Sequence, residues 1–175
     1  HVEAALGSYD QAIALNPDFA EAYSNRGGAL IELNQLNDAL ESFDKAIALS
    51  PDYADAHLNK AQLRLLRGNL EIGWELYEWR HIGRRDPKIV SRLWLGCEPI
   101  VGKVILLHSE QGLGDTIQFC RYAKLVADLG ARVVFVAPPP LMKLLENLAG
   151  VSELIVTGAS LPNFDFQCPL LSLPL

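Results

Sequence analysis

The N-terminal half of the chain repeats itself every 34 residues, and this period constrains the fold more than any other feature. Ala12-Ile13-Ala14-Leu15 recurs as Ala46-Ile47-Ala48-Leu49, and Pro17-Asp18 recurs as Pro51-Asp52. Units of this length bury their apolar faces against neighbouring copies and stack into solenoids. The pattern predicts paired helices near Ala20–Leu33, Asn37–Leu49, Ala54–Arg67 and Leu70–Trp79.

Helix pairs of this period that end in proline resemble the tetratricopeptide repeat. Small residues such as Gly27 let paired helices approach, and Tyr9, Phe43 and Tyr77 fill the gaps between them. Residues 1–82 would hold about two and a half repeats, because the chain starts at the second helix of one. We expect the natural chain to extend upstream, since the absent first helix leaves an apolar face uncovered.

Asn25 and Asn59 fall at the same position of successive first helices. The repeats of O-GlcNAc transferase carry an asparagine there that holds peptide backbone. This resemblance implies a groove for a protein or peptide partner, with both side chains on one concave face. Ordinary solvent-facing polar residues are the alternative interpretation.

Aromatic residues crowd the end of the last repeat at Trp74, Tyr77 and Trp79. Their simplest role is to cap the solenoid or to dock it on the next domain. A platform for stacking sugars is the alternative. Residues 83–102 then form a linker that carries several basic side chains.

Residues 103–175 predict an α/β fold. A short apolar run, Val104–Leu107, leads through the loop Ser109–Asp115 into an amphipathic helix. The apolar face of that helix would carry Ile117, Phe119, Tyr122, Ala123, Val126 and Leu129. Further strands are expected at Arg132–Val136, Glu153–Val156 and Asn163–Cys168, with a helix at Pro140–Ala149. Alternation of strands and helices predicts a parallel, Rossmann-like sheet with an exposed edge, about half of a complete domain.

The loop after the first strand lies where open α/β sheets bind their ligands. It lacks the Gly-Lys-Ser/Thr of a phosphate-binding P-loop, and Ile117 replaces the third glycine of a dinucleotide fingerprint. We expect Gly112 and Gly114 to let the backbone turn tightly and approach a ligand. The following helix would offer its N-terminus to an anion. A plain structural turn is the alternative.

The stretch Gly102 to Tyr122, GKVILLHSEQGLGDTIQFCRY, resembles the glycosyltransferase module that follows tetratricopeptide repeats in many bacterial proteins. That module is similar to the ADP-heptose:lipopolysaccharide heptosyltransferases, which have the GT-B fold and a Gly-Asp pair matching Gly114-Asp115. The resemblance implies transfer of a sugar from a nucleotide-sugar donor to a hydroxyl acceptor. Because such enzymes bind the nucleotide mainly in a second domain, we expect these residues alone to transfer no sugar.

The same resemblance implies that Asp115 is the base that deprotonates the acceptor hydroxyl. A first-turn carboxylate that stabilises its helix is the alternative. His108, at the end of the first strand, is a second candidate base, although a core histidine is the more common role of such a residue. The residues we expect to bind substrate are Glu110, Gln111, Gly112, Gly114, Thr116 and Gln118. The sequence shows no metal-ligand spacing and indicates no cofactor besides the donor itself.

The net charge of −6 comes entirely from the residues through Asp86, and the remainder is balanced. An acidic repeat region argues against nucleic acid as a partner. No apolar run approaches the length of a membrane span. Cys97, Cys120 and Cys168 lack metal spacing and indicate a reducing compartment, so we expect a cytoplasmic protein.

Taken together, the residues predict tetratricopeptide repeats followed by part of a GT-B N-terminal domain. The predicted function is sugar transfer by the parent protein, with repeats that bind a protein or peptide. The alternative is a non-catalytic scaffold for protein–protein interaction in which the α/β part is only structural.

Overall fold

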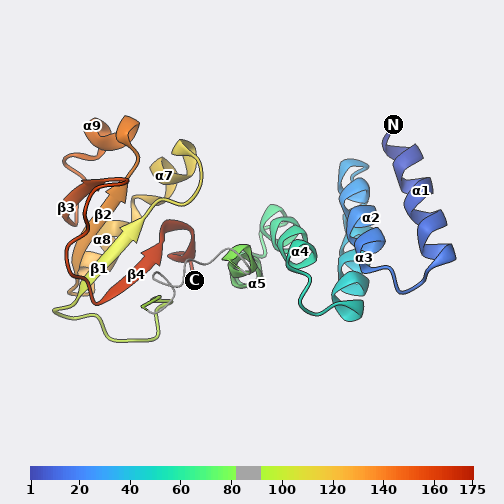
Figure 1. The fold of residues 1–175 in the computed structure, drawn as a ribbon, viewed down its shortest axis with the longest axis horizontal. Coiled ribbons are helices and arrows are strands. Elements are labelled where there is room, and N and C mark those ends of the chain that lie inside the picture. Colours follow the sequence, from blue (N-terminus) through green and yellow to red (C-terminus); the bar gives the residue numbers. More distant parts are fainter. Residues whose placement is uncertain (82–91) are drawn as a thin grey trace. The chain divides into compact units, whose positions relative to one another are not determined.

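The computed structural model describes residues 1–81 and 92–175. The chain forms two compact units, His1–Arg84 and Arg85–Leu175, each with its own core (Figure 1). The first unit contains only helices, and the second contains a sheet with short helices. The predicted fold class, a helical solenoid followed by a parallel α/β sheet, is confirmed.

The helices of the first unit follow the predicted repeat. They are α1 (Val2–Leu15), α2 (Ala20–Glu32), α3 (Leu36–Leu49), α4 (Ala54–Leu66) and α5 (Leu70–Tyr77). The last predicted helix is too long, because α5 gives way to a 3₁₀ turn, η1, at Glu78–His81. Each helix packs on the next, and α2 also contacts α4. The first helices of successive repeats therefore lie side by side.

The repeat also governs how the first helix of each pair ends. Asn34 and Gly68 share one repeat position and both have a left-handed backbone, with φ of 59° and 76°. After each, a backbone N–H reaches back to a carbonyl of the preceding helix, from Gln35 to Leu30 and from Asn69 to Arg64. These bonds satisfy carbonyl groups that a helix end leaves free. The same turn thus starts α3 and α5.

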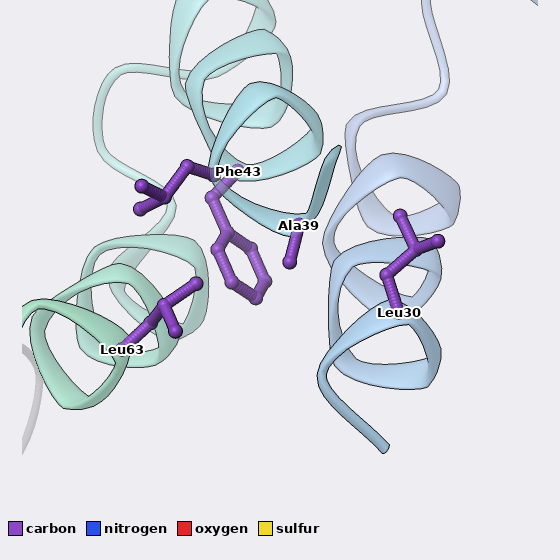
Figure 2. Packing of buried hydrophobic residues seen from close by; sticks show 5 residues of the cluster. Leu30, Ala39, Phe43 and Leu63 are labelled. Carbon is purple, nitrogen blue, oxygen red and sulfur yellow. The ribbon is translucent and has the colours of Figure 1, made fainter. Parts of the chain in front are cut away.

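The core of the first unit depends on a close approach between α2 and α3. Phe43 of α3 is fully buried and packs with Leu30, Ala39 and Leu63 (Figure 2). A Cβ atom added at Gly27 would lie 2.5 Å from Cε1 of the Phe43 ring. Only glycine leaves room for this ring at this helix separation. The predicted role of Gly27 is therefore confirmed.

Ion pairs recur with the same period between a second helix and the first helix that follows it. Arg26 Nε lies 2.8 Å from Asp10 Oδ1, and Lys60 Nζ lies 2.5 Å from Asp44 Oδ1. Arg26 also donates a hydrogen bond to Ser42 Oγ at 2.7 Å. These pairs connect consecutive repeats in register. Because the acids are half exposed, each pair contributes only a fraction of a kcal/mol.

The second unit is built on four parallel strands in the order β3-β2-β1-β4. The strands are β1 (Val104–His108), β2 (Arg132–Ala137), β3 (Val151–Val156) and β4 (Phe166–Pro169). Their connections contain α7 (Leu113–Phe119), α8 (Tyr122–Asp128), η2 (Pro139–Leu141) and α9 (Met142–Leu145), and η3 (Leu170–Ser172) follows β4. The apolar runs of central β1 and β2 are largely buried, as predicted.

Several predicted bounds in this unit are wrong. The helix after β1 is two helices, because a tight turn at Cys120 bonds Ala123 N–H to the Cys120 carbonyl. Phe119, Ala123 and Val126 of the expected apolar face are buried, whereas Ile117 and Leu129 are 47% and 55% exposed. The helix expected at Pro140–Ala149 is a 3₁₀ turn and the four-residue α9.

The segment before β1 packs on the sheet. Leu93 forms a parallel bridge with Gln167 of β4, and Trp94 is buried, with its indole N–H donating to the Glu98 carbonyl at 2.9 Å. Residues 92–102 fall in the predicted linker, whose first part, 83–91, lies outside the described residues. The expected open edge is thus partly covered at β4. Backbone groups of an edge strand gain partners in this way.

Asp165 joins β4 to the start of β1. Its Oδ2 accepts a hydrogen bond from Val104 N–H at 2.8 Å, and its Oδ1 lies 3.6 Å from Lys103 Nζ. The backbone hydrogen bond, helped by the Lys103 charge, holds the pKa of this carboxyl below its ordinary value. The charged form is therefore the one that stabilises the strand pair.

We predict opposite effects for two adjacent glycines of α2. Gly27→Ala places a methyl group against the buried Phe43 ring and should lower the free energy of unfolding by about 1 kcal/mol or more. Gly28→Ala meets no atom within 4 Å and should raise it by up to about 1 kcal/mol through helix propensity. Urea unfolding followed by helical circular dichroism measures both. Equal effects would contradict the packing argument.

We predict that Asp165→Asn loosens β1 in a pH-dependent way. The lowered pKa means that the carboxylate stabilises the fold above the pKa of the unfolded chain and loses this effect as the pH falls through the folded value. Amide hydrogen exchange of β1 should be faster in the variant at neutral pH, and the difference should vanish well below about pH 4. A difference that persists at low pH would exclude the ionised form as the cause.

Candidate functional site

A groove of about 340 Å³ opens on the first unit between α1, α2 and α4. Asn25, Gly28 and Glu32 of α2 follow one another at intervals of three to four residues, so they lie on the helical face that lines the groove. Its full lining is His1, Val2, Ala5, Tyr9, Ser24, Asn25, Gly28, Ala29, Glu32 and Asn59. Apolar side chains come from α1, and polar ones come from α2 and α4.

The structure brings Asn25 and Asn59 together in this groove. Asn25 is exposed, and Asn59 is half-buried, with its Nδ2 donating to Ser24 Oγ at 3.3 Å. Each asparagine offers an amide N–H and a carbonyl oxygen, the pair of groups that matches a peptide unit. The two residues are therefore more than scattered solvent-facing polar residues, since both line one concavity.

Tyr53, at the start of α4, marks the end of this surface near Ser24. Burial raises the pKa of the Tyr53 hydroxyl, and the negative charges of Asp55 and Glu21 raise it further. A hydrogen bond with Ser24 acts in the opposite direction. Two carboxylates from successive first helices therefore lie close enough to influence one phenol.

The aromatic residues at the end of the repeats pack within the first unit. The Trp79 indole stacks on the His57 ring at 3.7 Å with an interplanar angle of 2°, and Trp74 meets Tyr77 edge to face. Arg80 lies 4.9 Å from the centre of the Tyr77 ring. One face of Trp79 is thus occupied by a protein side chain. This packing supports the capping role over the sugar platform.

The second candidate site is the loop between β1 and α7, at the carboxyl end of the sheet. Ser109 N–H donates to the Val136 carbonyl at the end of β2, which anchors the loop to its neighbouring strand. Gly112 and Gly114 are exposed, and neither has a positive φ. The backbone of this turn therefore does not depend on glycine, and the close approach of a ligand at these positions stays a prediction. A Cβ atom added at Gly114 would meet open space, whereas one at Gly112 would lie 3.4 Å from Asp115 Oδ2.

Asp115 lies in the first turn of α7, as predicted. Its Oδ2 accepts a hydrogen bond from Gly112 N–H at 3.1 Å, which satisfies one free donor of the helix start. Its Oδ1 has no hydrogen-bond partner among the described residues. Thr116 is buried, with its hydroxyl donating to the Gly112 carbonyl. The carboxylate thus caps a helix and retains one oxygen for another contact.

His108 is held from the neighbouring strand. Its Nε2 donates to Oε1 of Gln167 at 2.7 Å, and Gln167 is almost fully buried. Because one ring nitrogen donates there, Nδ1 is the position at which the neutral ring accepts a proton. Sequence reasoning missed Gln167. The register of the strands would have revealed this residue, since β4 pairs with β1 and places Gln167 opposite Leu106.

The remaining predicted substrate residues divide into two groups. Glu110 is half-buried, and its Oε1 accepts a hydrogen bond from Leu171 N–H at 3.3 Å, so its carboxylate holds η3 against the loop. Gln111 and Gln118 are exposed. Among the described residues, no group of three or more His, Cys, Asp or Glu side chains is arranged to hold a metal ion.

The comparisons with known proteins show what the first unit is similar to. The family model described as TPR repeat matches residues 2–31 and 27–68. The chain is 33% identical over 118 residues to Protein FlbA of Caulobacter vibrioides, an alignment that covers 63% of this chain and 20% of FlbA. The chain spans about a fifth of the length of that curated relative. The alignment is longer than the first unit and so continues into the second.

Solved structures give more distant likenesses. The TPR2AB-domain:pHSP90 complex of yeast Sti1 is 26% identical over 46% of this chain and 31% of that chain, with a TM-score of 0.44. A mutant O-GlcNAc transferase of Thermobaculum terrenum is 14% identical over 88% of this chain and 38% of that chain, also with a TM-score of 0.44. At such scores neither structure supports a functional argument.

The family model and the helix arrangement agree on the architecture. Helical repeats of the tetratricopeptide type are followed by a four-stranded parallel sheet. In the part of the chain that the structure describes, no helix is both long and apolar enough to span a membrane.

Proposed function

We propose that the first unit binds a peptide segment of a partner protein in the groove between α1, α2 and α4. The observation that supports this proposal best is the shared position of Asn25 and Asn59 in one concavity. Their repeat position is the one at which a ladder of amides would hold an extended peptide backbone. The match to the tetratricopeptide family supports the same function, because solenoids bind partners on their concave surfaces.

The chemistry of binding follows from the amide groups. An extended peptide exposes alternating N–H and C=O groups, and an asparagine side chain pairs with both. Asn25 is exposed and ready to do so, whereas Asn59 must share its N–H with Ser24. Apolar side chains of the peptide would contact Val2, Ala5 and Tyr9 along α1. Backbone recognition of this kind tolerates different partner sequences.

A second proposal concerns the parallel sheet as part of a sugar-transferring enzyme. The supporting observation is the Gly114-Asp115 pair at the start of α7, at the carboxyl end of β1, where α/β folds bind their ligands. The sequence around this pair resembles the heptosyltransferase-like module described above. The proposed donor is a nucleotide-sugar, and the proposed acceptor is a hydroxyl group. In this role Asp115 Oδ1 accepts the hydroxyl proton, and His108 Nδ1 is the alternative acceptor.

A non-catalytic scaffold is the competing function. In that case Glu110 and Asp115 serve only to hold η3 and to cap α7. The full-length sequence distinguishes the two, since a second α/β domain with a nucleotide-binding loop favours the enzyme. The heptosyltransferase-like identity of the module and the cytoplasmic localisation stay predictions.

We predict that replacing both asparagines weakens peptide binding. Peptides selected from a display library on the wild-type chain should bind the variant Asn25→Ala/Asn59→Ala about 5- to 100-fold more weakly, because each amide supplies about 0.5–1.5 kcal/mol of hydrogen bonding. Calorimetric titration measures the affinity. Gln11→Ala, which removes an exposed amide outside the groove lining, should bind normally. Unchanged affinity in the double variant would refute the groove.

We predict that Asp115→Asn lowers sugar transfer by the full-length protein about 10²- to 10⁴-fold, the usual contribution of a general base. The amide oxygen still accepts the Gly112 hydrogen bond, so thermal stability should remain nearly unchanged. The 175 residues alone should show no turnover of a nucleotide-sugar above a buffer control. If Asp115→Asn lowers thermal stability but leaves sugar transfer normal, Asp115 has a purely structural role. If both stability and sugar transfer stay normal, the catalytic base lies elsewhere, and His108 is the next candidate.

A further inference from the structure

The charge of the chain is concentrated on the unit that contains the groove. His1–Arg84 holds 13 acidic and 7 basic residues, a net charge of −6, whereas Arg85–Leu175 holds 8 of each. The acids of α2 and α4, the helices that carry the two asparagines, are Glu21, Glu32 and Asp55. All three are exposed, and none forms an ion pair with a described residue. Their charges are available to a partner.

These acids flank the asparagines on both sides. Along α2, Glu21 lies one turn before Asn25 and Glu32 lies two turns after it, close to the same helical face. Glu32 lines the groove together with both asparagines. At the other rim, Asp55 lies one turn before Asn59 along α4, at the repeat position of Glu21, and both carboxylates influence the Tyr53 hydroxyl. The peptide path therefore runs between two acidic rims.

The cations of α2 and α4 do not neutralise these rims. Arg26 pairs with Asp10, and Lys60 pairs with Asp44, on the neighbouring second helices. Arg64 occupies the repeat position of the buried Leu30 and lies about 140° around the helix from Asn59. Among the described residues, no basic side chain lines the groove apart from the terminal His1.

We infer that the partner segment is a basic peptide, extended over Asn25 and Asn59, with lysine or arginine side chains on both edges. This inference rests on the proposed peptide-binding function and specifies its partner. Successive side chains of an extended strand point to opposite sides. One edge then meets Glu21 and Asp55, and the other meets Glu32. Electrostatic attraction of this kind sets partner choice and speeds association at low salt.

The test uses three fluorescein-labelled nonapeptides of identical serine- and threonine-rich sequence that carry lysine, glutamine or glutamate at four shared positions. Fluorescence polarisation with the 175-residue chain measures their affinities. We expect the lysine peptide to bind most tightly, the glutamine peptide to bind more weakly and the glutamate peptide not to bind. The preference for lysine over glutamine should shrink strongly between about 50 mM and 500 mM salt.

Two triple variants separate the rims from the overall charge. Glu21→Gln/Glu32→Gln/Asp55→Asn should weaken the lysine peptide about 3- to 100-fold, because exposed pairs contribute about 0.2–1 kcal/mol each. The matched control Glu71→Gln/Glu41→Gln/Asp38→Asn changes the net charge equally, on helices whose residues do not line the groove. It should retain wild-type affinity. Both triples remove two first-turn acids, so thermal unfolding should change equally in the two.

The outcomes separate this inference from the proposed function. Binding that depends on Asn25 and Asn59 but is equal for the lysine and glutamine peptides overturns the basic partner and leaves the peptide groove intact. Equal loss in the two triple variants also overturns it, since net charge alone then explains the preference. If no peptide binds the wild-type chain, or if binding ignores the asparagines, the groove proposal fails and this inference fails with it.

Discussion

The close contact between Gly27 and Phe43 determines the spacing of the helical unit. A ring fully buried against a residue without a side chain lets α2 and α3 pack at short range, and Leu63 of α4 closes the same cluster. Because that contact sets α2 beside α4, it also sets Asn25 beside Asn59. The groove is therefore a consequence of core packing, and its polar lining can vary without loss of the fold.

The repeat could be predicted from sequence because equivalent residues face equivalent neighbours in each copy. The helix bounds and the groove asparagines both followed from the 34-residue period. Glu32 and Gly28 were missed, since their counterparts in the next repeat are Leu66 and Gln62. Helical spacing from Asn25 would have found them. A repeat period identifies residues that are the same in successive repeats, and it does not identify functional residues that occur in only one repeat.

The sheet was predictable in its class and its strand direction, and less so in its details. Asp115 Oδ2 contacts its own helix because it accepts a hydrogen bond from Gly112 N–H. The sequence pattern did not specify this bond. Glu110 likewise uses its carboxylate on the Leu171 backbone, 61 residues away. The break at Cys120 depends on local backbone geometry as well. Long-range partners and local turns are the parts that periodicity does not encode.

The strand order has a consequence for synthesis of the chain. Contacts in the helical unit join residues of neighbouring repeats, whereas β1 must wait for β4 and for Asp165 just before it, 61 residues beyond Val104. At about 5–20 residues per second, a ribosome needs roughly 3–12 s to cover that distance. During this interval the repeats are already complete, and one edge of the apolar central strand has no partner. The nascent chain therefore passes through a state in which a folded solenoid carries an unfinished sheet, and the unpaired edge of its apolar strand is the kind of surface that favours aggregation.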